Sequence, residues 1–302
     1  MDTNWLEDFV CFGRLLNFTK AAAERNVTQS AFSRRIMSLE HWIGAELIDR
    51  KTFPATLSDA GVEFLPVAKR MLQRLHRSRD EIRAKSGTGA DTLRFTAPHS
   101  ISIHNLMPLL SNLETILPEL KTQVVSDNLH NCFDQLAENN CDFLMCYKSA
   151  DIPIMLDEQA FDCIEMGSDK LLPVCSPTIG TDKKLPGWNE EPIPYLQYSR
   201  GSFLGSVVEQ LFSSQPPNLA VKHVNAFSEA LKNLCVHGAG IAWLPEASIK
   251  RELEEGQLII AGNEEWWVDL KVVMYTDAQF HQKITDSVWC HFQSMAAGQK
   301  AA

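Results

Sequence analysis

The sequence predicts an α/β multidomain protein with a small helical unit at the N-terminus, a long linker helix and a C-terminal region of two α/β subdomains. Three observations predict this organisation. Residues 1–58 contain three helix-like patterns followed by a short β-branched stretch, residues 59–85 carry one continuous amphipathic pattern, and strand-like and helix-like segments alternate after residue 91. A chain of 302 residues is long enough for two or three units with separate cores.

The N-terminal unit is predicted to contain a first helix over Asn4–Leu16 and two shorter helices joined by a tight turn. Thr19 is a suitable N-cap for a helix over Lys20–Arg25. Thr28 caps the next helix, which runs to about Trp42 before the stop signal of Gly44. The apolar residues of this last helix recur at spacings of three and four and form a buried stripe: Phe32, Ile36, Leu39 and Ile43.

The opposite face of that helix carries small polar and cationic side chains, which suit base edges and phosphates in a DNA major groove. These residues are Gln29, Ser30, Ser33 and Arg34. The segment Glu46–Ser58 fits a small hairpin that would lay Arg50 and Lys51 on the DNA backbone. Residues 1–58 are therefore predicted to form a winged helix-turn-helix that binds double-stranded DNA.

The next helix is capped by Ser58 or Asp59 and has a seam of the coiled-coil type, formed by Leu65, Ala68, Leu72, Leu75, Arg79 and Ile82. Such a helix either packs on its own domain or pairs two subunits. Its position directly after a DNA-binding unit favours dimerisation, because dimers commonly read two half-sites. Residues 59–88 are expected to be this linker and dimerisation helix with a Gly- and Ser-containing hinge.

Residues 89–302 are expected to form an α/β domain with a largely parallel sheet in each subdomain. Subdomain I is expected at about 89–162 and 268–302, and subdomain II at about 163–267. Predicted strands include Lys170–Cys175, and predicted helices include Ser102–Thr115. Loops at the carboxyl ends of the strands would line a cleft between the two subdomains.

The charge distribution separates the two regions. The net charge is −10, but residues 1–86 carry +3 and the remainder −13, so only the first region is suited to phosphate contacts. No apolar run approaches the length of a membrane span, and acidic residues occupy the start of the chain where a signal peptide is basic. A cytoplasmic protein without membrane contact is expected.

The eight cysteines show no C-x-x-C pair and no zinc-binding spacing with histidine, so neither a metal site nor a cofactor is predicted. In a reducing compartment such residues are mostly buried and inert. Cys146, next to Tyr147 and near Lys148, and Cys235 remain candidates for a redox sensor.

Two motifs carry a family resemblance. The run NFTKAAAERNVTQSAFSRRIMSLEHWIGAELIDR, followed by TLSDAG, resembles the winged helix-turn-helix of LysR-type transcriptional regulators, and LKNLCVHGAGIAWLPEASI resembles the second signature of that family. PHSISI, YSRGSFLG and GIAWLPE resemble the hypochlorite-responsive branch. That branch senses by methionine oxidation, and Leu204 stands where its methionine is expected.

The resemblance implies a regulator that binds an inverted-repeat promoter site as a homodimer or homotetramer, contacts RNA polymerase and responds to a small molecule or oxidant. It implies base contacts by Gln29, Ser33 and Arg34 and phosphate contacts by Arg35 and Arg50, with Ser30 in place of the usual proline. The implied effector residues are His99, Ser100, Tyr147, Ser199, Arg200, Ser202, Leu204 and Phe227.

Several of these residues have a second interpretation. Ser100, expected just ahead of a helix, favours an anion there, but Ser100 and Ser202 also suit simple N-caps. Arg200 suits a clamp on a carboxylate effector or a tie between its loop and a surface carboxylate, and His99 suits a pocket donor, a pH-sensitive group or a hydrogen-bonded packing residue. The α/β region alone resembles a periplasmic solute-binding protein. An enzyme is not predicted, since G-x-S-x-G, H-E-x-x-H, P-loop and G-x-G-x-x-G motifs are absent.

Overall fold

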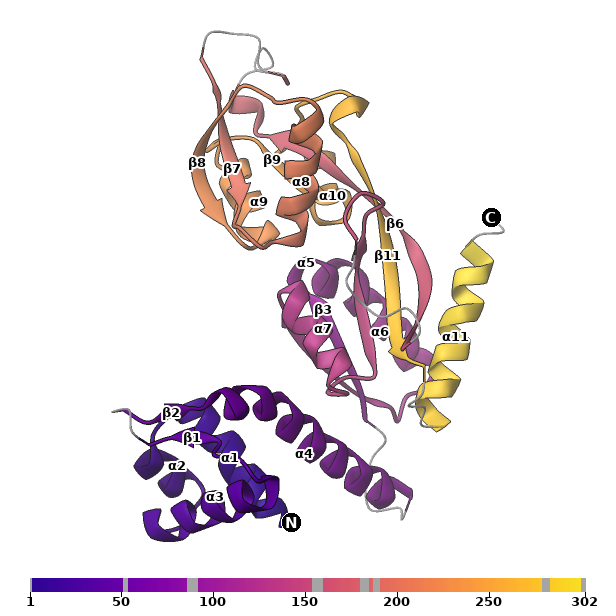
Figure 1. The fold of residues 1–302 in the computed structure, drawn as a ribbon. Coiled ribbons are helices and arrows are strands. Elements are labelled where there is room, and N and C mark those ends of the chain that lie inside the picture. The colour runs from indigo at the N-terminus through magenta and orange to yellow at the C-terminus, as the bar shows by residue number, and fades with distance from the viewer. Residues whose placement is uncertain are drawn as a thin grey trace. The chain divides into compact units, whose positions relative to one another are not determined.

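The computed structural model describes residues 2–50, 54–85, 92–153, 160–179, 185–186, 191–278 and 283–299 (Figure 1). Met1–Ala90 forms most of one compact unit, and Asp91–Ala137 with Cys141–Ala302 forms the other. The expected wing residue Lys51 and the expected hinge at 86–88 lie outside the described residues. Each unit is considered by itself below.

The N-terminal unit is a three-helix core with a two-stranded hairpin. Its elements are α1 (Thr3–Leu15), α2 (Phe18–Glu24), α3 (Gln29–Ile43), β1 (Ile48–Asp49), β2 (Thr56–Leu57) and the long α4 (Asp59–Lys85). The core is aromatic, with Phe9, Phe12 and Phe32 fully buried. The strands β1 and β2 pair antiparallel, so the described part of Glu46–Ser58 has the form of a wing.

Capping explains where the short helices begin and end. Thr28 caps α3 by accepting a hydrogen bond from the Ala31 amide, and α3 ends at Gly44, whose φ of +83° is easily adopted only by glycine. The expected cap of α2 was wrong. Asn17, not Thr19, accepts the hydrogen bond from the Lys20 amide at 3.0 Å, and Asn is at least as good a cap as Thr.

The apolar residues along α4 lie in two different environments. Ala68 and Leu72 are buried in the core of the N-terminal unit, whereas Leu75 and Ile82 are 48% and 66% exposed. The first turn of this helix packs so closely against the Leu47 backbone that position 61 requires glycine, since a Cβ there would lie 2.0 Å from the Leu47 carbonyl oxygen. The first half of α4 therefore packs on its own unit, and the second half leaves apolar side chains at the surface.

The C-terminal unit contains a seven-stranded sheet in the order β10-β6-β11-β5-β3-β4, with β9 also paired to β6, and a separate parallel pair of β7 and β8. The strands are β3 (Thr92–Pro98), β4 (Lys121–Asp127), β5 (Phe143–Lys148), β6 (Phe161–Cys175), β7 (Ile193–Tyr198), β8 (Leu219–Asn225), β9 (Ala242–Pro245), β10 (Ile259–Ile260) and β11 (Val268–Asp277). The expectation of a largely parallel sheet was wrong for the large sheet, because β6 and β11 run antiparallel to each other and to their other partners.

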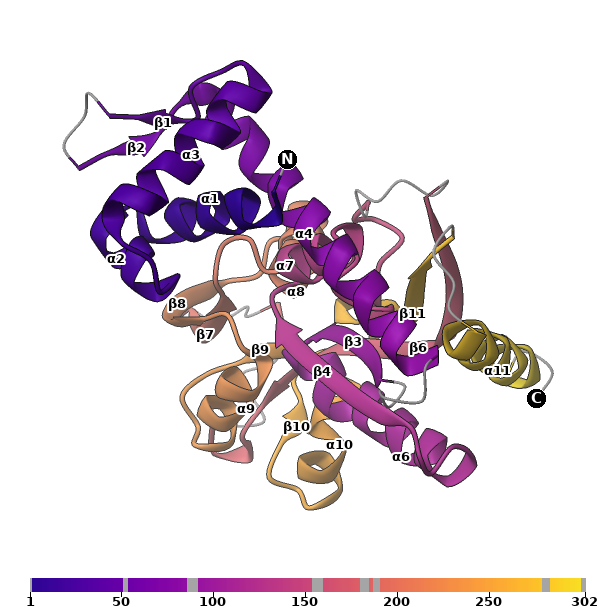
Figure 2. The same cartoon turned by 90° about the horizontal axis from the view of Figure 1, so that it is seen from below.

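The long strands β6 and β11 join two α/β halves (Figure 1). The first half contains β3, β4 and β5, and the second contains β7, β8 and β9. The helical elements are α5 (His99–Ile101), η1 (Ser102–Leu106), α6 (Met107–Ile116), α7 (Leu129–Ala137), η2 (Pro177–Ile179), α8 (Phe203–Ser214), α9 (Ser228–Val236), α10 (Glu246–Glu254), η3 (Glu264–Trp266) and α11 (Lys283–Gln299). In both Figure 1 and Figure 2, α11 lies beside β6.

In the C-terminal unit, the start of one helix, the start of one strand and the presence of a further helix differ from the sequence predictions. A continuous helical segment, α5 to η1 to α6, begins at His99 rather than Ser102, so Ser100 lies in its first turn rather than ahead of it. The strand β6 begins at Phe161, nine residues before the expected strand at Lys170. The helix α10 was not expected. Among the described helices, none is both long and apolar enough to cross a membrane.

Candidate functional site

The first candidate site is the polar face of the N-terminal unit. The start of α2, the polar face of α3 and the wing enclose a shallow hollow of about 500 Å³. Its lining consists of Leu16, Asn17, Phe18, Thr19, Gln29, Ser33, Arg50, Pro54 and Ala55. Three of the residues predicted to contact DNA, Gln29, Ser33 and Arg50, thus share one surface, and Thr19 Oγ1 donates to Gln29 Oε1 at 3.4 Å.

Arg34 and Ser30 complete this face one turn apart on α3. Both side chains are exposed, and the Ser30 hydroxyl lies 3.2 Å from that of the cap residue Thr28. No ion-pair partner for the Arg34 guanidinium occurs among the residues described here. An exposed guanidinium without a carboxylate partner is available for bidentate bonding to a guanine or a phosphate.

The two expected phosphate contacts Arg35 and Arg50 have internal partners. Arg35 Nη1 lies 3.3 Å from Asp8 Oδ2, and Asp8 is fully buried and also pairs with Arg25 at 2.7 Å. Arg50 Nη2 lies 2.7 Å from Glu40 Oε2. Arg35 follows Arg34 by one residue and so points about 100° away, toward α1. Its structural contact with Asp8 differs from the role expected from the sequence.

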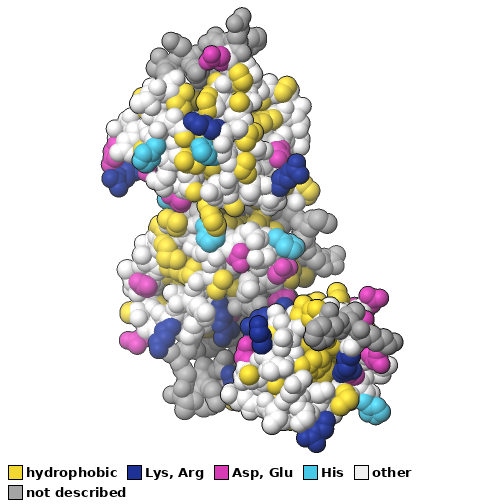
Figure 3. All heavy atoms as spheres, turned by 90° about the vertical axis from the view of Figure 1, so that its left-hand side faces the viewer, with side chains coloured by type: hydrophobic (Ala, Val, Ile, Leu, Met, Phe, Trp, Pro, Cys, Tyr) yellow, Lys and Arg dark blue, Asp and Glu magenta, His cyan; other side chains and the backbone are white. Residues whose placement is uncertain are grey.

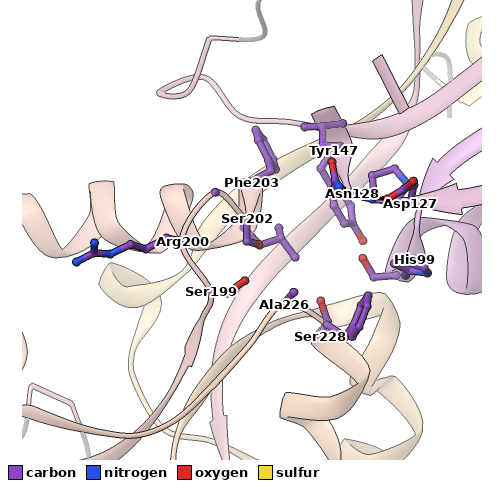
Figure 4. Close-up of a pocket in the computed structure, with 16 residues that line it drawn as sticks. His99, Asp127, Asn128, Tyr147, Ser199, Arg200, Ser202, Phe203, Ala226 and Ser228 are labelled. Carbon is purple, nitrogen blue, oxygen red and sulfur yellow. Dashed lines mark hydrogen bonds between the residues drawn. The ribbon is translucent and has the colours of Figure 1, made fainter. Parts of the chain in front are cut away.

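The second candidate site is a cavity of about 460 Å³ between the two halves of the C-terminal unit. All eight predicted effector residues line it, together with Pro98, Asp127, Asn128, Leu129, Gly201, Phe203, Ala226 and Ser228. In Figure 4, His99, Asp127, Asn128 and Tyr147 lie on one side and Ser199, Ser202, Phe203 and Ser228 on the other. Both sides are carboxyl ends of parallel strands, where α/β proteins bind ligands.

Arg200 does not take the position of an anion clamp. Its side chain is exposed, and Figure 4 shows the guanidinium extending away from the other labelled residues. The backbone of the turn at 199–201 lines the cavity, but the charge of Arg200 lies toward solvent. The expectation of a carboxylate clamp at this residue is therefore not met by the direction of its side chain.

Tyr147 connects the cavity wall to the crossing strand β6. Its Oη donates to Asp169 Oδ2 at 2.6 Å, while Asp169 Oδ1 accepts from the amides of Lys170 at 2.8 Å and Ala247 at 3.2 Å. Burial and the neighbouring Asp169 carboxylate raise the pKa of the Tyr147 phenol, so it remains a neutral donor. Asp169 thereby joins the cavity, β6 and the start of α10.

The hydroxyl groups of the cavity differ in their availability. Ser202 Oγ caps α8 by accepting from the Gly205 amide at 3.4 Å, and Ser228 Oγ accepts from Tyr198 Oη at 3.1 Å. Ser100 is 8% exposed, and its hydroxyl has no hydrogen-bond partner in the described part of the chain. Ser100 is the buried hydroxyl that a ligand can still engage.

Two contacts join α5 and η1 in the first half to the start of α9 in the second. The rings of His99 and Phe227 meet edge to face, with centroids 4.8 Å apart. His104 Nε2 lies 2.7 Å from Glu229 Oε1, and Glu229 Oε2 lies 2.8 Å from Lys232 Nζ. The hydrogen bond from His104 and the contacts with Lys232 lower the pKa of Glu229. His99 is thus held by ring packing at the cavity.

The sequence prediction missed the turn from β4 into α7, which contributes Asp127, Asn128 and Leu129 to the cavity. Asn128 Oδ1 caps α7 by accepting from the Asn131 amide at 2.9 Å. The family resemblance named His99 and Ser199, but the rule that loops at strand ends line the cleft applies equally to this strand. The polar pair Asp127-Asn128, at the end of β4, was therefore a usable signal.

The two redox candidates lie in apolar surroundings. Cys146 and Cys235 are fully buried. Burial raises the pKa of Cys146 well above its usual value and that of Cys235 to about 12. Because the thiolate is the reactive form, this burial argues against the expected sensor role of both residues. No group of three metal-binding side chains is assembled among the described residues.

Comparison with known proteins gives matches over nearly the whole chain. A model described as the LysR substrate binding domain matches residues 86–286, and one described as the bacterial regulatory helix-turn-helix protein, lysR family, matches residues 3–62. The HTH-type transcriptional regulator YjiE of Escherichia coli K12 is 30% identical over 291 residues, which cover 96% of this chain and 93% of YjiE.

Two full-length solved structures are also similar. HypT from Salmonella typhimurium, a hypochlorite-specific LysR-type transcriptional regulator, is 28% identical with a TM-score of 0.57, over 98% of this chain and 99% of HypT. DarR from Vibrio fischeri, solved in complex with DNA, is 26% identical with a TM-score of 0.57, over 97% of this chain and 98% of DarR.

Proposed function

Because this chain belongs to the LysR family of bacterial transcriptional regulators, we propose that α3 reads a promoter sequence and that the cavity of the C-terminal unit receives the controlling signal. The observation that supports DNA reading best is the exposed face of Gln29, Ser30, Ser33 and Arg34, with an unpaired guanidinium beside a hollow of about 500 Å³. The related DarR was solved with DNA bound.

The role proposed for each side chain follows from its exposure and from its partners within the protein. Gln29, Ser30, Ser33 and Arg34 contact bases or the adjacent backbone, because they project from one side of α3. Arg50 keeps 38% of its side chain exposed beside Glu40 and, with Lys51 of the wing, contacts phosphates. Arg35 acts through Asp8 by holding α3 against α1.

The proposed domains are a winged helix-turn-helix at 1–58, a linker and dimerisation helix with hinge at 59–88, and an effector-binding domain at 89–302. Within the last, subdomain I comprises about 89–162 and 268–302, and subdomain II about 163–267. Dimerisation through α4 is supported by Met71 and Leu75, which are 43% and 48% exposed on one face near the middle of the helix.

A tetramer would form through the effector-binding domains. The exposed side chains of Ile103 and Met107 on η1 and α6, and of Val221 and Val224 on β8, offer apolar surface for this contact. Figure 3 looks onto the side where β8 lies in Figure 1 and shows hydrophobic side chains spread over it. Four subunits would place two DNA-binding pairs on one promoter with an inverted-repeat site.

The signal would act by a shift between two arrangements of the subunits. A small molecule or oxidant held in the cavity must bind one arrangement more tightly than the other, because equal affinity shifts nothing. The favoured arrangement then sets the bend of the promoter and the contact with RNA polymerase. The chain acts through binding rather than catalysis in this scheme.

The finer assignment to the hypochlorite-responsive branch is supported by the similarity to HypT, which is 28% identical over nearly the full chain. The branch senses by methionine oxidation, whereas Leu204, buried at the cavity, has no sulfur. Any oxidant response of this chain would therefore use another residue or a different ligand at the same cavity.

Gel-shift binding of the ligand-free protein to its own upstream region, at moderate salt, tests the proposed function. Specific binding predicts that a scrambled duplex of equal length competes at least tenfold less well. The oligomeric state is measured in the same sample by light scattering. Intact dimers that bind no DNA above the scrambled control would contradict the proposal.

A further inference from the structure

The charges around the cavity differ from those that a simple anion requires. Asp127 and Arg200 are the charged side chains among its lining residues, and Arg200 extends away from the cavity (Figure 4). Asp127 Oδ1 accepts from the Asn128 amide at 2.7 Å and from Asn128 Nδ2 at 3.2 Å. Asp127 Oδ2 has no hydrogen-bond partner within the described ranges, so one carboxylate oxygen is open to a cationic group.

An anionic group also has a place in the cavity, close to Asp127. The helical segment that begins at His99 and the helix α9 that begins at Ser228 both start at the cavity without a side-chain cap. Uncapped helix starts present backbone N–H groups and a positive dipole end. The unpaired hydroxyl of Ser100, a residue only 8% exposed, lies in the first turn of the former.

The register of the sheet makes these two places neighbours. Pro98 of β3 is the in-register partner of Asp127 of β4 in a parallel pair, and paired strands lie about 4.8 Å apart. Ser100 follows Pro98 by two residues. A negative group at Ser100 and a positive group at Asp127 would therefore lie at the adjoining ends of β3 and β4 on one wall of the cavity, an arrangement that suits opposite charges on one small molecule.

The remaining wall is largely apolar. Phe227 and His99 meet edge to face at 4.8 Å, and Leu129, Phe203 and Leu204 lie around the rest of the cavity. The volume of about 460 Å³ is within the range of small-ligand sites. This wall suits an uncharged aliphatic or aromatic group of the ligand, which leaves both charges at the Ser100 and Asp127 end.

We propose that the cavity binds a zwitterionic α-amino acid with an apolar side chain, its carboxylate at Ser100 and the helix starts and its ammonium group at Asp127. The proposal rests on the proposed role of this cavity as the signal site and names the ligand class. A carboxylic acid without an amino group would leave Asp127 repelling its anion, and an amine without a carboxylate would leave Ser100 unpaired.

The test uses the full chain and the L and D forms of leucine, methionine and phenylalanine, first by thermal shift and then by calorimetry. For leucine the matched probes are 4-methylpentanoate, which lacks the ammonium group, and 3-methylbutylamine, which lacks the carboxylate. We expect at least one amino acid to bind about tenfold to a hundredfold more tightly than either of its matched analogues, the range for a hydrogen bond to a charged group.

Two substitutions test which residue binds the ammonium group and which binds the carboxylate of the ligand. Asp127→Asn should weaken the amino acid about tenfold and remove the preference over the deaminated acid, whereas Ser100→Ala should weaken both. Asp134→Asn is the matched control, because this exposed carboxylate on α7 pairs with His130 outside the cavity lining. It should leave both affinities unchanged.

The ligand class is refuted if none of the six amino acids binds. It is also refuted if 4-methylpentanoate binds the unaltered protein as tightly as leucine while every other amino acid fails. Finally, it is refuted if the Asp127→Asn variant keeps the full preference for the amino acid over the deaminated acid. DNA binding of the ligand-free protein is measured on the same preparations. Specific DNA binding without amino-acid binding overturns the ligand class alone, and loss of DNA binding overturns the proposed function.

Discussion

Replacing Tyr147 by Phe tests the contact that joins the cavity wall to β6. Tyr147 Oη donates to Asp169 Oδ2 at 2.6 Å, and the two residues are 3% and 8% exposed. Tyr147→Phe removes the donor and leaves one buried carboxylate oxygen without its partner. An unpaired buried group costs about 1–3 kcal/mol. Because Oδ1 keeps the amides of Lys170 and Ala247, we expect a loss of about 2 kcal/mol.

Asp169→Asn should cost less, because the new amide keeps its oxygen toward the two backbone amides and turns its NH₂ group toward Tyr147 Oη, which can accept. A loss of about 1 kcal/mol follows from exchanging a charged hydrogen bond for a neutral one. The two residues share one bond, so the double variant should lose about 1 kcal/mol less than the sum of the single losses.

Urea unfolding of the full chain at pH 7, followed by tryptophan fluorescence, measures these free energies. Tyr195→Phe is the matched control, since Tyr195 is equally buried and its hydroxyl makes no hydrogen bond in the described part of the structure. Equal losses for Tyr147→Phe and Tyr195→Phe, or additive losses at Tyr147 and Asp169, would refute this account of the contact. The pKa of Tyr147 is raised in the folded protein. The contribution of its neutral phenol to the free energy of unfolding is therefore complete below about pH 10, the ordinary pKa of tyrosine, and declines above that pH.

Three further predictions concern charged side chains. Arg34→Ala should weaken specific DNA binding by about 1–3 kcal/mol and relax base preference, whereas Lys51→Ala should weaken all sequences alike; equal loss of Arg34→Ala on random DNA would show phosphate contact alone. His104→Gln should lower the thermal midpoint more than His130→Gln, because His104 Nε2 lies 2.7 Å from Glu229 Oε1 between two mostly buried side chains, whereas the side chains of His130 and Asp134 are largely exposed. Glu229, whose pKa His104 and Lys232 lower, loses its contribution only as the pH falls toward and below about 4. Equal drops for the two variants would contradict a stabilising contact at His104. Arg200→Ala should leave ligand affinity within about twofold by calorimetry, since its guanidinium extends away from the cavity; a tenfold loss would show that Arg200 turns inward on binding.

Sequence patterns within a few residues were sufficient to predict α3 but not β6. Thr28 and Gly44 cap α3 as predicted, because capping depends on neighbours within four residues. The first half of β6, from Phe161 to Asp169, mixes exposed, partly buried and buried positions without regular alternation and gives no clear strand pattern. Its conformation is imposed by pairing with β11, a contact that no local pattern encodes.

The same distinction separates the parts of the site. Strand ends such as those before Ser100 and Ser199 were expected to line a cleft because the ends of parallel strands meet at one edge, but the individual residues came from the family resemblance. Side-chain direction was not predictable for Arg200, because spacing places its backbone at the cavity while packing of the turn directs the guanidinium outward (Figure 4). The start of α10 depended on Asp169, which accepts from the Ala247 amide 78 residues away.

The two contacts between the helical segment α5-η1-α6 and α9 hold the two walls of the cavity together. His99 and Phe227 meet at the cavity, while His104 and Glu229 meet further along the same two elements. Under the proposed function, a ligand seated between Ser100 and Phe227 would add to these contacts and favour closure of the walls on each other. It can shift that balance only by the difference in its affinity for the arrangements with the walls together and apart. A substitution that weakens the His104–Glu229 contact should lower ligand affinity without touching the ligand, because part of the binding energy must then restore closure.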